Sequence, residues 1–146
     1  MNTPAGYLLD TSVVSVPAMI APDPEVVRKI EMHGAECAIA APVWHELVFG
    51  CRRLPKGKRR SALEEYVHEV VGKTFRILPY DDRAAAWHGS ERARLEAAGK
   101  PAPFVDGQIA AIAVTLGLTL VTLNIRDFRQ FQGLQIETWS KRPNKS

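Results

Sequence analysis

Four acidic residues occupy positions from which they could do chemistry together: Asp10, Glu46, Asp106 and Asp127. Taken alone, each has a simpler explanation. Asp10 and Asp106 can cap helices, Glu46 can pair with a buried arginine, and a turn accounts for an acid such as Asp127. Brought close together, the four carboxylates would repel one another and their pKa values would rise. A divalent cation removes that cost, so their conjunction predicts a metal site.

The contexts of Glu46 and Asp106 indicate helix faces that pack against the rest of the chain. The same-face neighbours of Glu46 in a predicted helix are apolar or lack a side chain: Val43, Phe49 and Gly50. A carboxylate on such a face is costly unless a partner compensates its charge. Asp106 borders the apolar stripe of a second predicted helix and lies in its first turn, where the helix dipole favours an anion.

The types of donor indicate the kind of cation. Hard cations such as Mg2+ and Mn2+ prefer ligand sets made entirely of oxygen, and carboxylates provide such a set. No spacing of His or Cys residues favours zinc. Asn124, three residues before Asp127, adds a further polar oxygen beyond the end of a predicted strand. We therefore expect Mg2+ or Mn2+ at this site.

The elements that must position these residues are short apolar strands alternating with helices. The predicted strands cover residues 7–10, 36–41, 74–78, 119–122 and 134–138. The predicted helices cover residues 24–33, 42–53, 57–71, 82–98 and 105–116, several of them followed by a glycine. This alternation predicts an α/β/α sandwich with a mostly parallel sheet of four to five strands. Ligands of such sheets bind beyond the carboxyl ends of the strands, where Asp10 and Asp127 fall.

Length and composition fit one globular domain. The chain has 146 residues, from which we expect a core over residues 6–139 and a flexible tail over residues 140–146. Neither a secretion signal nor a membrane span is expected. Two cysteines, Cys37 and Cys51, are too few for a disulfide scaffold, so we expect free thiols and a cytoplasmic protein.

The net charge of +3 permits a polyanionic partner, and the basic residues are unevenly distributed. One run lies within nine positions: Arg52, Arg53, Lys56, Lys58, Arg59 and Arg60. Two further cations, Arg126 and Arg129, flank Asp127. These side chains are either a solvated helix end or contacts to the phosphates of a nucleic acid.

Four motifs give the chain a specific resemblance. They are LDTS at residues 9–12, HEL at residues 45–47, PFVD at residues 103–106, and TLNIRDF at residues 122–128. Their types, order and spacing resemble those of PIN-domain ribonucleases, and among them the VapC-type toxins of bacterial toxin–antitoxin pairs. The similarity extends over about residues 6–139. Leu123 is a departure, because many family members carry Arg there, but it affects no expected ligand.

The resemblance implies a Mg2+- or Mn2+-dependent endoribonuclease, a homodimer, and an inhibitory antitoxin whose peptide fills a groove. Asp10, Glu46 and Asp106 would bind or orient the metal, and Asp127 would complete the cluster. Thr11, Ser12 and Asn124 would hold a carboxylate or a water molecule in place. A dication held in this way activates water for attack on an RNA phosphodiester. The basic run would then position the RNA backbone.

Other readings of the sequence stay open or are weaker. A free-standing RNA-processing nuclease keeps the same chemistry without an antitoxin, and a PIN-like module without catalysis could bind RNA or protein. A phosphate-accepting receiver domain needs an acceptor Asp after its third strand, where this chain has Pro79-Tyr80. No glycine-rich phosphate-binding motif supports a nucleotide-binding module.

Overall fold

The computed structural model describes residues 5–142, and its centre is a sheet of five parallel strands. The strands are β1 (Tyr7–Leu9), β2 (Cys37–Ala40), β3 (Arg76–Leu78), β4 (Thr119–Val121) and β5 (Gln135–Glu137), in the order β3-β2-β1-β4-β5. The central strands β1, β2 and β4 are apolar because most of their side chains are buried. The predicted α/β fold is confirmed, and every strand pairing in the sheet is parallel.

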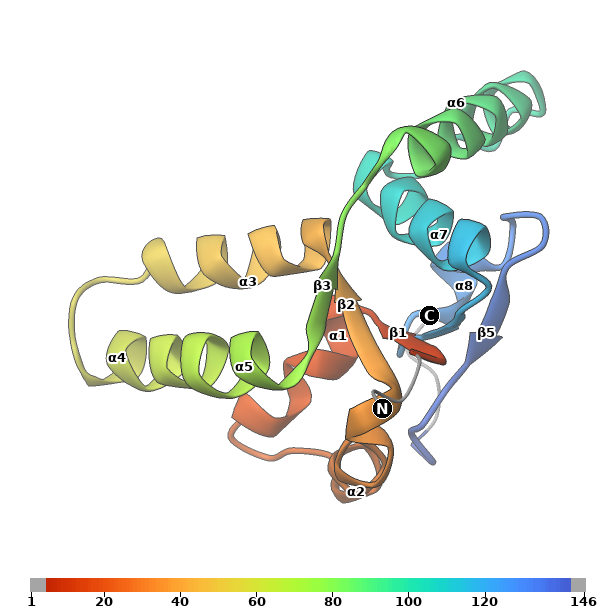
Figure 1. Cartoon of the computed structure of the whole chain (residues 1–146). Helices are drawn as coiled ribbons and strands as arrows, with labels where there is room; N and C mark the ends of the chain where they lie inside the picture. The colour runs from red at the N-terminus through yellow and green to blue at the C-terminus, as the bar shows by residue number, and fades with distance from the viewer. Residues whose placement is uncertain (1–4, 143–146) are drawn as a thin grey trace.

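Helices lie on both sides of the strands (Figure 1). They are α1 (Thr11–Val14), α2 (Pro24–His33), α3 (Ala41–Arg52), α4 (Lys58–Glu65), α5 (Gly72–Thr74), α6 (Asp82–Ala97), α7 (Phe104–Leu116) and α8 (Ile125–Phe128). Three further segments form other kinds of helix. Two are 3-10 helices, η1 (Val16–Ala18) and η2 (Gly34–Glu36), and the third is a π-helix, η3 (Tyr66–Val71). Helices α3 and α4 pack together as a hairpin that projects away from the sheet, and α6 packs along α7.

Local sequence signals explain where several helices begin and end. The side chain of Asp23 accepts a hydrogen bond from the backbone N–H of Glu25 and caps α2. Asp81 caps α6 in the same way, through the N–H of Ala84. Helix α7 ends at Gly117, whose φ of 68° is the left-handed conformation that favours glycine.

The predicted end of the third helix, at residue 71 before Gly72, is wrong. Helical structure continues through Gly72 to Thr74, by way of the π-helical turn η3. Glycine fits closely here, because a Cβ at Gly72 would lie 3.0 Å from the ring of Trp44, a tighter contact than usual. Its role is therefore a close approach between this helix and α3.

The chain after β5 has fixed partners at its start. The ring of Trp139 is buried, and the hydroxyl of Ser140 donates a hydrogen bond to Asp23. The sequence predicted a flexible tail over residues 140–146. Residues 143–146 of that tail lie outside the described residues. Both cysteines are free and buried. Within residues 5–142, every helix is too short or too polar to span a membrane.

Candidate active site

Asp10 is fixed at the carboxyl end of β1 by the neighbouring strand β4. Its backbone N–H donates to the carbonyl of Val121 at 3.0 Å, which continues the pairing of β1 with β4. Its side chain is buried, and the Oδ2 atom accepts hydrogen bonds from the hydroxyls of Ser12 at 3.0 Å and Thr122 at 2.8 Å. The two hydroxyls hold this carboxylate in one orientation.

The same hydroxyls connect Asp10 to the loop after β4. Ser12 Oγ accepts from the backbone N–H of Leu123 at 3.1 Å, and Thr122 Oγ1 accepts from that of Asn124 at 2.9 Å. The expected positioning role of Ser12 therefore has a direct structural basis. Thr122 also positions the Asp10 carboxylate, but it was not identified as a site residue from the sequence. Its only signal is its place directly after a strand, which becomes informative once β4 is known to adjoin β1.

Asp106 is carried by the first turn of α7, and close packing against α6 positions that turn. A Cβ at Gly107 would lie 2.1 Å from Nε2 of His88, so the imidazole occupies the space beside the glycine. The hydroxyl of Tyr80 lies 2.9 Å from Nδ1 of His88, and the ring centroids of Phe104 and His88 are 4.9 Å apart. These contacts join the loop after β3, α6 and α7 next to Asp106.

The electrostatics of Asp106 depend on two of the other predicted acids. Burial, together with the smaller effect of the negative charges of Asp10 and Asp127, raises the pKa of Asp106 to about 6. Within residues 5–142, no hydrogen-bond donor contacts its side chain. Asp127 lies in the first turn of α8 and is exposed to solvent. Asp10 and Asp127 therefore both act on the charge of Asp106, and the three acids are the candidate site at the strand ends.

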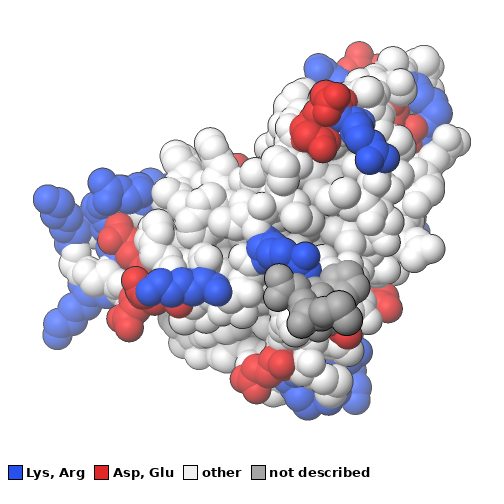
Figure 2. Space-filling view, in the orientation of Figure 1, with Lys and Arg blue, Asp and Glu red and all other residues white. Residues whose placement is uncertain are grey.

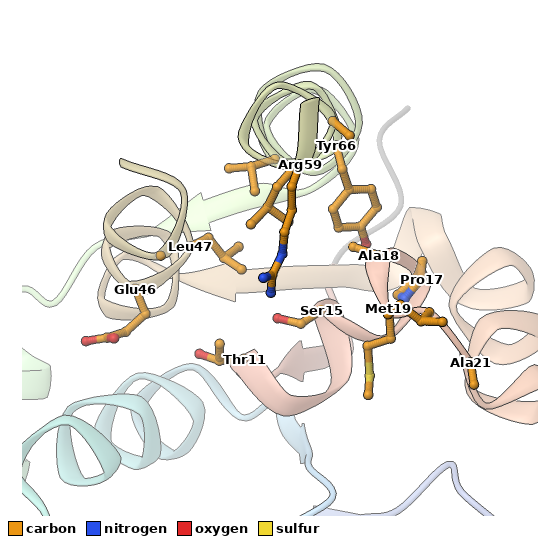
Figure 3. A pocket seen from close by; sticks show the side chains of 15 residues that line it. Thr11, Ser15, Pro17, Ala18, Met19, Ala21, Glu46, Leu47, Arg59 and Tyr66 are labelled. Atoms are coloured by element: carbon orange, nitrogen blue, oxygen red, sulfur yellow. The ribbon is translucent and has the colours of Figure 1, made fainter. Parts of the chain in front are cut away.

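Glu46 is placed differently from the prediction. It lies on α3 and is exposed, whereas Val43 on the same helix is fully buried. The argument from an apolar, packed helix face is wrong, because Phe49 on that face is itself 54% exposed. Glu46 instead lines a groove together with Thr11, and Figure 3 shows Glu46 extending from α3 and Thr11 from the start of α1.

The donor types of this site fit a divalent cation. Asp10, Asp106 and Asp127 provide only oxygen ligands, and a cation would oppose both the burial and the repulsion that raise the pKa of Asp106. In the described part of the chain, no three His, Cys, Asp or Glu side chains are arranged closely enough to hold a metal ion. The fit therefore rests on charge and donor chemistry.

Comparison with known proteins identifies the family. The PIN domain matches residues 7–134, which is most of the chain. The chain belongs to the PIN-domain family. This confirms the family expected from the four motifs, and with it the class of enzyme, a nuclease.

The relatives of this PIN domain are toxins and endonucleases of similar length. The chain is 31% identical to the tRNA(fMet)-specific endonuclease VapC of Shigella flexneri, over 92% of this chain and 98% of the relative. It is 33% identical to Toxin FitB of Neisseria gonorrhoeae, over 83% and 89% of the two chains. VapC nucleases of this family are metal-dependent in general.

Solved structures agree with the fold. A structure of FitAB bound to a DNA fragment aligns with a TM-score of 0.84 and 27% identity, covering 95% of this chain and 99% of the other. DNA-bound VapBC from Salmonella typhimurium aligns with a TM-score of 0.80 and 26% identity, covering 92% and 98%. The whole PIN domain thus follows the architecture of these proteins.

Two cavities of the PIN domain flank the segment formed by α1 and η1. The first is a groove of about 870 Å3 between this segment and the α3–α4 hairpin. Its lining is mainly apolar, and it also includes the charged residues Glu46 and Arg59. The second has a volume of about 570 Å3 and lies between the same segment and the chain after β4 and β5. Thr11, Ser15 and Met19 line both cavities.

The basic run lies at the outer end of the α3–α4 hairpin, where Figure 2 shows Lys and Arg side chains gathered. Arg60 is 14% exposed and pairs with Glu64 at 2.9 Å, so its charge is already compensated within the fold. Arg52 lies 3.8 Å from the same carboxylate. Arg59 differs from both, because its guanidinium reaches from α4 into the first groove toward Ser15 (Figure 3).

Proposed function

We propose that this PIN domain is a Mg2+- or Mn2+-dependent endoribonuclease and the toxin of a toxin–antitoxin pair. The observation that carries the proposal is the negative site at the strand ends, where burial and two neighbouring acids raise the pKa of Asp106. A site that places carboxylates together in this way needs a cation to be stable when ionised. Relatives named tRNA(fMet)-specific endonuclease and ribonuclease support RNA as the substrate.

Asp10, Asp106 and Asp127 would hold the cation, with Glu46 facing it from the rim of the first groove. When bound, the cation supplies an activated water molecule and stabilises negative charge on the scissile phosphate. The hydroxyls of Ser12 and Thr122 keep the Asp10 carboxylate oriented, so that it needs little rearrangement. Thr11 and Asn124 line the adjoining cavities and would orient water or substrate there.

Positive side chains must offset the repulsion between this site and an RNA backbone. Arg53, Lys56, Lys58 and Arg59 on the hairpin, and Arg126 and Arg129 beside α8, are suited to phosphate contacts. Arg52 and Arg60 contribute less, since both lie close to Glu64. Such contacts would position the strand and carry little information about its sequence.

An antitoxin is the second partner in this proposal, and the first groove is its binding site. The FitAB and VapBC complexes among the structural relatives support a protein partner. The groove is lined by apolar side chains such as Leu47 and Leu63, and Met19 at its edge is more than half exposed. A helical peptide with apolar side chains and an acid facing Arg59 would complement it. A homodimer belongs to the same proposal.

RNA cleavage by variants of the acids tests the function. In the presence of Mg2+, we expect Asp10→Asn, Glu46→Gln and Asp106→Asn each to lower cleavage by roughly a hundredfold or more. The fold should survive, as checked by circular dichroism. Glu31→Gln, an exposed acid on α2, is the matched control and should cleave like the unaltered protein. Near-normal cleavage by all three site variants would exclude the mechanism.

A further inference from the structure

The second cavity has no assigned role, and its walls come from three strand ends. Ser12 follows β1, Asn124 follows β4, and Thr138 and Ser140 follow β5. Its volume of about 570 Å3 falls within the range of roughly 300–1,000 Å3 that is usual for small-molecule sites. Because Ser12 also donates to Asp10, this cavity adjoins the candidate active site directly.

The charges in this cavity are balanced. Its two charged residues, Asp23 and Arg142, lie 3.6 Å apart, and Asp23 also accepts from the hydroxyl of Ser140. An isolated phosphate or metal ion would therefore find no unpaired opposite charge among the described lining residues. The cavity is consequently suited to a neutral group with polar edges.

The remaining lining combines hydrogen-bonding groups with apolar side chains. Hydroxyls and an amide come from Ser12, Asn124 and Thr138, and apolar contact comes from Val16 and Leu123. A nucleoside needs both kinds of contact, because its base has polar edges and apolar faces and its ribose carries hydroxyls. Proteins recognise single-stranded RNA in this manner, by receiving unstacked bases and contacting the 2′-hydroxyl.

We propose that the second cavity receives one nucleoside of the RNA substrate, adjacent to the scissile phosphate, while the first groove is left to the protein partner. This inference rests on the proposed ribonuclease function. The two cavities flank the α1–η1 segment and differ in their charged residues: Glu46 and Arg59 line the first, whereas Asp23 and Arg142 in the second pair with each other. The second cavity would thus influence which base is accepted beside the cleavage point.

A filling substitution at the rim tests this proposal. Thr138 is exposed on the cavity wall, so Thr138→Trp can obstruct the cavity without disturbing the core. With single-stranded oligoribonucleotides and Mg2+, we expect its KM to rise about tenfold while kcat changes less than about threefold, as expected for the loss of one base contact. Gln132→Trp, also exposed but outside both cavities, is the control and should keep the normal KM.

A binding measurement that does not depend on catalysis accompanies the kinetics. Titration of the unaltered protein with adenosine, cytidine, guanosine and uridine should shift the backbone amide NMR signals of Leu123, Asn124 and Thr138 for at least one nucleoside. A protein that cleaves RNA, but whose Thr138→Trp variant has an unchanged KM, would overturn the cavity proposal alone. Absence of RNA cleavage by the unaltered protein would instead overturn the proposed function.

Discussion

Asp10 and Asp106 belong to the same site, yet the fold treats them in opposite ways. Asp10 is buried and accepts hydrogen bonds from two hydroxyls, which come from its own turn and from the end of β4. Asp106 lies on α7 without a donor among the described residues, and burial together with two nearby acids raises its pKa to about 6. One carboxylate is stabilised by the fold, whereas the other would be stabilised by the proposed cation.

This difference gives the two carboxylates of the proposed metal site different roles: one would set its rigidity and the other its affinity for the cation. The hydroxyls around Asp10 orient a ligand before any ion binds, which lowers the cost of binding. The repulsion at Asp106 makes the ion-free state less stable, so that a cation gains more by binding. Substitutions around Asp10 and around Asp106 should therefore affect stability and cation binding differently.

The largest effect is expected where α6 packs against the turn that carries Asp106. Gly107→Ala would place a Cβ 2.1 Å from Nε2 of His88, so the imidazole or α7 must move. We expect unfolding in urea to show a loss of about 2–3 kcal/mol, as is usual for overpacking. Gly89→Ala is the matched control on α6, because its Cβ would meet nothing within 4 Å, and it should stabilise the helix slightly. Equal stabilities of the two variants would contradict this packing.

Removal of one donor from Asp10 should have the next largest effect. Thr122→Val leaves the buried carboxylate with fewer partners, and a hydrogen bond to a charged group contributes about 1.5–3 kcal/mol. We therefore expect a loss of about 2 kcal/mol in urea unfolding and weaker RNA cleavage. Thr122→Ser retains the hydroxyl and should restore most of both properties. If Val and Ser variants behave alike, Thr122 does not act through its hydroxyl.

An effect of similar size but opposite sign is expected for Asp106→Asn in the absence of divalent ions. The folded-state pKa of Asp106 is raised, so its ionisation reduces stability progressively as the pH rises from about 4 to about 6, and the whole penalty remains above that range. Asp106→Asn should consequently stabilise the protein by about 2 kcal/mol at pH 7.5 and by nothing below pH 4. Urea unfolding in EDTA at the two pH values measures this. A destabilised variant at pH 7.5 would show that Asp106 is not repelled.

The sequence predicts the fold well because its signals are local. Alternating apolar strands and capped helices define a parallel sheet, and an acid directly after β1 must lie at the carboxyl edge of that sheet. The cap at Asp23 and the left-handed end of α7 at Gly117 follow from residue type alone.

Properties that depend on pairing between distant segments escape such a prediction. Thr122 contributes to the site only because β4 adjoins β1, and Gly107 matters only because His88 packs against it. The exposure of Glu46 was mispredicted for a similar reason. An apolar side chain such as Phe49 need not face the core. Helical periodicity therefore wrongly assigned the exposed face of α3, which carries Glu46 and Phe49, to the packed side.

Binding of Mn2+ tests most directly whether these carboxylates form a metal site. Titrations followed by electron paramagnetic resonance at pH 7.5 would compare the unaltered protein with Asp106→Asn and with the control Glu31→Gln. We expect Asp106→Asn to weaken Mn2+ binding about tenfold or more, as for the loss of a site carboxylate, and Glu31→Gln to bind normally. Normal Mn2+ affinity in Asp106→Asn would contradict the assignment of this carboxylate to the cation.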